Sequence, residues 1–152
     1  MVTVARSTTI PIATGERLFA KWGFREVIEK QAAVILQPDI SHAGGILECK
    51  KIAAMAETYF SAIAPHCPLG PIALASCIQL DACIPNFLVQ EHVTTGVGYL
   101  KEPFQIVNGY IELPTKPGLG IELDEEALAE QINDGTWDTP QFRHKDGSVA
   151  DW

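Results

Sequence analysis

Four short apolar runs recur along the first 92 residues, and each is followed by a polar side chain in a loop. Apolar residues follow one another without alternation in each run, which is typical of a strand buried on both faces of a parallel sheet. The runs cover residues 9–14, 32–37, 60–64 and 87–90. This pattern predicts four buried strands.

Between the runs, apolar residues recur at helical spacing. Residues 24–28 carry a short stripe of this kind, and residues 72–82 carry a weaker one of small residues. The longest stripe follows Gly44 and Gly45 and consists of Ile46, Cys49, Ile52, Ala53, Ala56 and Tyr59. Strands and helices therefore alternate, which predicts parallel strands joined by right-handed crossovers.

The alternation stops at about Thr94. Residues 110–113 form a short strand candidate, and Asp124 precedes an acidic helix start that it is suited to cap. We therefore expect two regions. Residues 1–93 would form the sheet with its helices, and residues 94–152 would form a last helix region and a carboxyl-terminal tail.

A polar residue follows each apolar run. These residues are Glu16, Asp39, His66 and Glu91, at separations of 23, 27 and 25 residues, which match the length of a strand–helix unit. Because ligands bind at the carboxyl ends of parallel strands, the four side chains are expected on one rim. Each residue taken alone also fits an ordinary role, in a helix's first turn, a capped turn, a loop or a solvated strand end.

Composition excludes several classes of function. The chain has 152 residues, enough for one domain, and its 19 acidic and 11 basic side chains give a formal net charge of −8. With no basic stripe, binding of nucleic acid or an anionic membrane surface is disfavoured. No run reaches the ~18 apolar residues of a membrane span. The four cysteines show no Cys-x-x-Cys spacing, so we expect a reduced, cytoplasmic protein.

Four sequence segments resemble those of sugar-acid dehydratases of the enolase superfamily, within its mandelate racemase subgroup, and most of all the galactonate dehydratases. The segments are IATGER at residues 12–17, LQPDISHAGGI at 36–46, APHCPLGPI at 64–72 and PGLGIE at 117–122. The resemblance extends over nearly the whole chain. It implies a (β/α)8 barrel of which this chain forms the carboxyl-terminal half, strands five to eight, with a tail that would complete a capping domain.

The resemblance also implies a role for each strand-end residue. Glu16 would be a Mg²⁺ ligand, His66 the general base and Asp39 its hydrogen-bonded partner. Glu91 would hydrogen-bond the substrate carboxylate as it becomes an enediolate. Sites of this superfamily combine a Lys or His base with Mg²⁺. The implied reaction converts galactonate to 2-keto-3-deoxygalactonate by loss of the α-proton and the β-hydroxyl.

In this interpretation the chain lacks the residues that supply two further metal ligands and the general acid. We therefore expect a carboxyl-terminal fragment, inactive alone, that associates with the missing amino-terminal half or with itself and belongs to a homo-oligomer when full length. Three alternatives stay open: another acid-sugar dehydratase or a racemase, a truncated non-catalytic chain, and a self-contained flavodoxin-like sheet.

Overall fold

The structure is a computed structural model that describes residues 1–132, 135 and 141–150. Part of the predicted tail therefore lies outside the described residues. In the described part of the chain, no helix is long and apolar enough to cross a membrane.

A three-stranded parallel sheet lies at the centre of the fold. Its strands are β1 (Ala13–Thr14), β2 (Ile35–Leu36) and β3 (Ala62–Ile63), hydrogen-bonded in that order. Leu36 pairs with Thr14 on one side and with Ile63 on the other. The parallel order confirms the prediction from the continuous apolar runs.

The regular ladders are shorter than the apolar runs predicted. The run at 9–14 is paired only in its last two residues, because Pro11 has no N–H to donate to a ladder. The predicted fourth strand, at 87–90, contributes only a parallel bridge between Phe87 and Ile63. Two backbone bonds of 2.8 Å hold it there, from the Ile63 N–H to the Asn86 carbonyl and from the Leu88 N–H to the Ile63 carbonyl.

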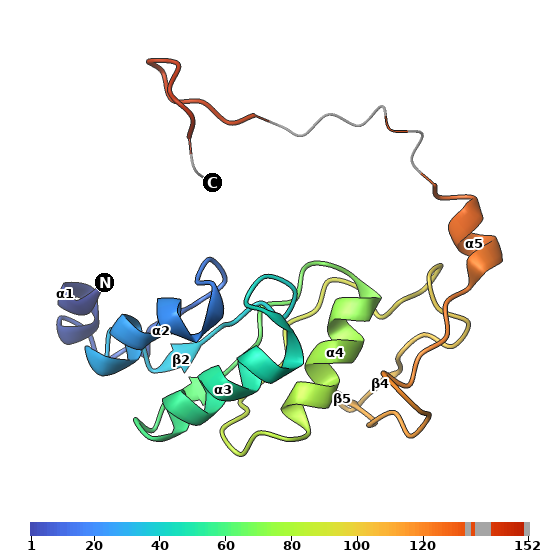
Figure 1. The fold of residues 1–152 in the computed structure, drawn as a ribbon, viewed down its shortest axis with the longest axis horizontal. Helices are drawn as coiled ribbons and strands as arrows, with labels where there is room; N and C mark the ends of the chain where they lie inside the picture. Colours follow the sequence, from blue (N-terminus) through green and yellow to red (C-terminus); the bar gives the residue numbers. More distant parts are fainter. Residues whose placement is uncertain (133–134, 136–140, 151–152) are drawn as a thin grey trace.

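Three helices pack side by side along the sheet (Figure 1). They are α2 (Ala20–Glu29), α3 (Gly45–Glu57) and α4 (Pro71–Asp81). The predicted stripe of α3 is confirmed at Cys49, Ile52, Ala53 and Ala56, all of which are buried. The helix α4 begins with Pro71, whose fixed φ suits a first helical position. Most of its residues are buried, and Ile72 in its first turn is exposed.

The remaining elements are small. A helix α1 (Val2–Arg6), which the sequence pattern did not predict, begins the chain. A hairpin joins β4 (Ile106–Val107) to β5 (Tyr110–Ile111), so the strand candidate at 110–113 is shorter than predicted and has a partner that was missed. The helix α5 (Glu125–Ala129) has the predicted cap, because Asp124 Oδ1 accepts the Ala127 N–H at 3.0 Å.

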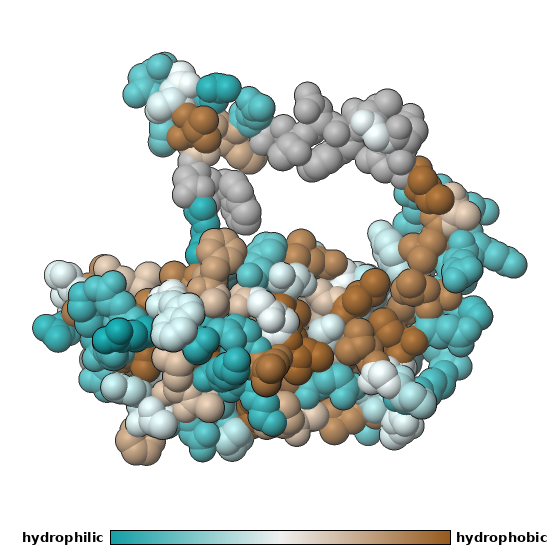
Figure 2. Space-filling view, in the orientation of Figure 1, coloured by the Kyte–Doolittle hydropathy of each residue, from teal (hydrophilic) through white to brown (hydrophobic). Residues whose placement is uncertain are grey.

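On the face of the molecule shown in Figure 2, apolar side chains are exposed to solvent over α4 and towards the hairpin. Leu69 and Ile72, at the start of α4, are each 52% exposed, and Val107 and Tyr110 of the hairpin are exposed as well. Patches of this kind often mark surfaces that bind another polypeptide.

Candidate active site

Glu16 follows the first strand and is positioned by a close backbone approach. The preceding residue, Gly15, has a φ of +147°, and a Cβ there would lie 2.8 Å from the Gln37 nitrogen and 2.9 Å from Phe24 Cε1. Only glycine leaves room for the chain to pass β2 at this distance. The Glu16 side chain emerges from this turn and is 46% exposed.

Asp39 follows the second strand and is buried, with 1% of its surface exposed. Its Oδ1 accepts the backbone N–H groups of Ser41 at 2.8 Å and of His42 at 3.1 Å. These bonds fold the loop after β2 around the carboxylate and leave Oδ2 for another donor. A buried carboxylate needs such donors to offset its loss of hydration.

His66 follows the third strand and supplies that donor. Its Nδ1 lies 2.9 Å from Asp39 Oδ2, and its side chain is only 14% exposed. The backbones of the two residues form a parallel bridge, in which the His66 N–H donates to the Pro38 carbonyl at 3.2 Å. The strand spacing and the side-chain contact therefore support each other.

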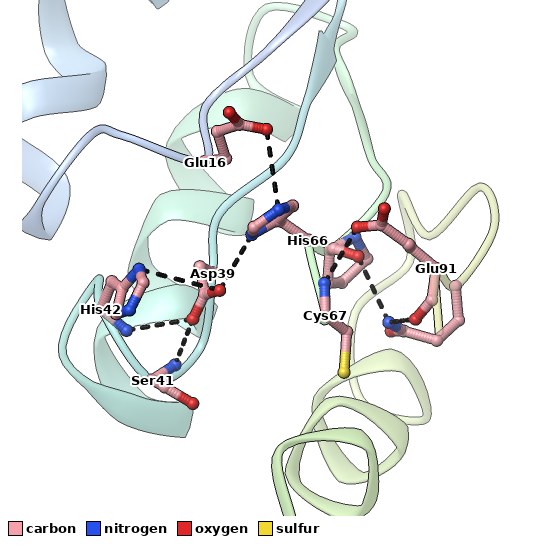
Figure 3. Close-up of polar contacts among 9 residues, drawn as sticks. Glu16, Asp39, Ser41, His42, His66, Cys67 and Glu91 are labelled. Atoms are coloured by element: carbon pink, nitrogen blue, oxygen red, sulfur yellow. Dashed lines mark hydrogen bonds and ion pairs between the residues drawn. The ribbon is translucent and has the colours of Figure 1, made fainter. Parts of the chain in front are cut away.

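The second nitrogen of His66 faces Glu16. Nε2 lies 3.6 Å from Glu16 Oε2 (Figure 3). Three strand ends thus supply a continuous row from the Asp39 carboxylate through the imidazole to the Glu16 carboxylate. The sequence pattern predicted that these residues share one rim, and the structure places them there.

Glu91 reaches the same rim by a backbone contact. Its Oε2 accepts the Cys67 N–H at 3.0 Å, next in sequence to His66. The neighbouring Gln90 side chain donates to the Pro65 carbonyl at 3.2 Å and so also spans the two strand ends. Glu91 is exposed, and its link to the other three residues is this hydrogen bond to the backbone of Cys67.

The sequence pattern did not assign His42 to the site. Its Nδ1 lies 3.8 Å from the same Asp39 Oδ2 that His66 contacts, and its ring packs near Phe19 with centroids 6.4 Å apart. The only available signal was its spacing, since a residue three positions after Asp39 in a tight turn can fold back onto the carboxylate.

Glu16 has the chemistry of a Mg²⁺ ligand, because it offers carboxylate oxygens from a half-exposed position. Asp39 already accepts hydrogen bonds from three N–H donors, and one oxygen of Glu91 accepts the Cys67 N–H. Among the residues that the structure describes, no group of three His, Cys, Asp or Glu side chains is arranged to hold a metal ion. The described residues therefore fit a metal site to which they supply one ligand, Glu16, and which they share with other groups.

Comparison with known proteins identifies related sequences and folds. The protein-family model described as "Enolase C-terminal domain-like" matches residues 1–127. Proteins named D-galactonate dehydratase from Variovorax paradoxus and from Cronobacter sakazakii are each 49% identical over 160 residues. Each alignment covers 98% of this chain and 42% of the relative, so the chain spans less than half the length of these curated relatives.

Solved structures give the same result. The structure of a mandelate racemase/muconate lactonizing enzyme from Sulfitobacter sp. is 46% identical and superposes with a TM-score of 0.79, covering 88% of this chain and 35% of that one. The predicted α/β fold class, the carboxyl-terminal part of a barrel, is confirmed.

Proposed function

We propose, from the premise that the chain belongs to the enolase C-terminal domain-like family, that its strand-end residues act in the dehydration of a sugar acid. The observation that carries this proposal is the 2.9 Å contact between His66 Nδ1 and Asp39 Oδ2. The relatives named D-galactonate dehydratase support galactonate as the substrate. The assigned roles of the four residues form part of the proposal.

The dyad determines which nitrogen of His66 acts as the base. With Nδ1–H donated to Asp39, the lone pair of the neutral imidazole is on Nε2. This nitrogen faces Glu16 and the open side of the rim. His66 would take the α-proton at Nε2, and the Asp39 carboxylate would stabilise the imidazolium that forms.

The charges of the site favour binding of a cation. Glu16, Asp39 and Glu91 are carboxyl side chains near one imidazole, and they would repel the carboxylate of a sugar acid. Removal of an α-proton adds a second negative charge, which needs a metal ion and oriented donors for stabilisation. We propose Mg²⁺, with Glu16 as one ligand. When bound, the ion would supply Lewis-acid stabilisation of the substrate carboxylate.

Glu91 would contribute a hydrogen bond at the substrate carboxylate. One of its oxygens accepts the Cys67 N–H, so the other is available. Donation to an enediolate oxygen requires that this second oxygen carry a proton. The Cys67 contact would hold the side chain at a fixed distance from His66, and orientation of this kind lowers the barrier to reaction.

A partner polypeptide is part of the proposal. Because the described residues form no three-ligand metal cluster and the chain spans 42% of its curated relatives, further ligands and a general acid would come from additional chain. The exposed apolar residues over α4 offer a surface for that polypeptide or for self-association. We expect the 152-residue chain alone to show no dehydratase activity and to bind Mg²⁺ weakly at most in calorimetric titration.

A chimera tests this function. The segment of the Variovorax paradoxus relative that aligns with this chain would be replaced by residues 1–152, so that the relative supplies the rest of the protein. With galactonate and Mg²⁺, we expect release of a keto acid and exchange of the α-proton in deuterated water. His66→Asn should lower both rates about 10²–10⁴-fold, the usual contribution of a positioned base.

The control is His144→Asn, the same substitution at an exposed histidine of the tail. It should leave both rates unchanged. Full α-proton exchange in the His66→Asn chimera would place the base elsewhere. Turnover of galactonate by the 152-residue chain alone would contradict the need for a partner. A folded chimera with neither activity would count against the dehydratase assignment.

A further inference from the structure

A cavity of about 270 Å³ lies between the carboxyl-terminal end of α4, residues 87–92 and the β4–β5 hairpin. The hairpin and this end of α4 lie side by side in Figure 1. Asp81 and Gln90 line the cavity, and most of the remaining wall is apolar, including Ile78, Phe87, Val89, Ile111 and Leu113. The described lining residues include none of the four strand-end side chains, so this cavity is separate from the candidate active site.

Two buried oxygens from the cavity wall have no hydrogen-bond partner among the described residues. They are Asp81 Oδ1 and Gln90 Oε1. The amide nitrogen of Gln90 already donates to the carbonyls of Pro65 at 3.2 Å and of Glu91 at 2.6 Å, so Gln90 has only an acceptor left to offer. A buried acceptor without a donor costs free energy, and both acceptors therefore favour a ligand that carries several donors.

The end of α4 also favours positive charge. Asp81 is the last residue of the helix, where the helix dipole places partial negative charge, and the last turn of α4 contains no basic residue. Burial raises the pKa of Asp81 to about 8, because it disfavours the charged form of the carboxyl group. A cation beside Asp81 would offset both the buried carboxylate and the helix dipole.

We propose that this cavity binds a primary ammonium group on an alkyl stem, with the ammonium between Asp81 and Gln90 and the stem against the apolar wall. The three N–H donors of an ammonium can serve both unpartnered oxygens. Two sources supply this chemistry: a free alkylamine, and a lysine side chain of a polypeptide that covers the exposed apolar residues over α4. The proposal does not depend on the dehydratase function, because it rests on the cavity and its two acceptors.

The ligand would enter by displacement of the hairpin, because both oxygens are screened from solvent. Ile111 packs against the core, whereas Ile106, Val107 and Tyr110 are exposed. A two-stranded hairpin is marginally stable on its own, so this one can open at a lower free energy than the helices and the sheet.

Binding of an ammonium should depend on pH. Asp81 must lose its proton to pair with the cation, so the affinity should rise about tenfold from pH 6 to pH 7 and level off above pH 8. His92 and Tyr110 also line the cavity, and the thiols of Cys67 and Cys77 lie within electrostatic reach of Asp81. A protonated His92 would repel the ligand in acid, so the same pH dependence must persist in His92→Gln.

The test is an NMR titration of the 152-residue chain with n-butylammonium chloride at pH 8. The Ile111 methyl and Gln90 amide signals should shift saturably, and n-butanol, which has the same stem without the charge, should bind about 10–100-fold more weakly. Asp81→Asn should weaken binding by a similar factor and abolish its pH dependence. The control is Glu112→Gln, which removes an exposed carboxylate beside the hairpin that is not among the described lining residues, and it should leave the affinity unchanged.

The chimera with the Variovorax paradoxus relative separates the two sources. Retained binding of n-butylammonium would identify a free amine as the ligand. Loss of binding, together with an Asp81→Asn substitution that destabilises the chimera at pH 8, would identify a lysine of the added polypeptide. Loss of binding with no such destabilisation would overturn the proposal. So would equal affinities for n-butylammonium and n-butanol, or an Asp81→Asn chain that binds as tightly as the parent.

Discussion

Replacing Asp39 by asparagine is expected to move the imidazole proton of His66 from Nδ1 to Nε2 with little change in the fold. In the protein, Asp39 Oδ1 accepts two backbone N–H groups, and Oδ2 accepts the imidazole Nδ1–H. Asparagine has only one oxygen. If that oxygen keeps the two backbone donors, the amide NH₂ must face His66 Nδ1, which then has to act as an acceptor.

The energetic balance favours this arrangement. The opposite orientation would set the NH₂ group against the N–H groups of Ser41 and His42 and leave both unpaired, at about 1–3 kcal/mol for each buried donor. In the favoured orientation all three contacts are kept; each loses the charge assistance of the carboxylate, and this loss is partly offset because a neutral amide costs less to bury than a charge. Asp39→Asn should therefore fold with slightly reduced stability, and Asp39→Ala should be markedly less stable.

The cost to chemistry is much larger. With Nδ1 as the acceptor, the imidazole carries its proton on Nε2, the nitrogen proposed to take the α-proton. The rate of α-proton exchange in the chimera should fall about 10²–10⁴-fold. The tautomer can be observed directly in the chain by the ¹⁵N chemical shifts of the His66 ring, and stability by urea unfolding.

The α-proton exchange rate and the position of the ring proton together test whether Asp39 sets the tautomer of His66. Loss of exchange together with a shift of the proton to Nε2 supports the dyad. An Asp39→Asn chain that keeps its proton on Nδ1, or a chimera that keeps its exchange rate, would show that Asp39 does not set the tautomer. Asp39→Ala is the control for simple loss of the contact, because it offers the ring neither donor nor acceptor.

Two further predictions concern stability. Gly15→Ala should lower the free energy of unfolding in urea by about 3 kcal/mol, because the added Cβ would lie under 3 Å from Gln37 and Phe24. The control is Gly45→Ala, where φ is +86° and no atom lies within 4 Å of the added Cβ, and it should lower the same free energy by about 1 kcal/mol. Equal losses in the two variants would contradict the steric argument. Burial raises the pKa of Asp81 to about 8, well above the usual range of a carboxyl group, and its Oδ1 has no hydrogen-bond partner among the described residues. The native state therefore keeps this proton while the unfolded chain loses it, and Asp81 makes stability fall as pH rises from about 4 to about 8. Asp81→Asn should equal the parent at pH 4 and exceed it at pH 8, and the same difference at both pH values would contradict this assignment.

The sequence pattern predicted the parts of the fold that are governed by burial. Apolar stripes marked α2, α3 and α4, and the ends of the apolar runs placed Glu16, Asp39 and His66 on one rim. Strand lengths were overestimated, because an apolar run shows burial and does not show how far a ladder of hydrogen bonds extends. The β4–β5 hairpin was missed, although the pair Asn108-Gly109 is typical of the tightest hairpin turns. Such turns require positive φ at both residues, and both have it in the structure.

Contacts that depend on side-chain direction were beyond the sequence pattern. The approach of His42 to Asp39 depends on the turn that Ser41 closes. The unpartnered Asp81 oxygen is a property of the end of α4 in its surroundings. In each case the sequence shows the residue type but does not show which group lies next to its side chain.

The backbone bridge between Asp39 and His66 restricts how the chain can change in length. Each residue lies three positions beyond the last ladder pair, Leu36 with Ile63, and each follows a buried proline, Pro38 or Pro65. An insertion in one connector would displace its side chain by about 3.3 Å along the strand and break a 2.9 Å contact. Among homologous sequences, insertions and deletions should therefore be absent between strand and dyad and should collect in the exposed turns beyond it.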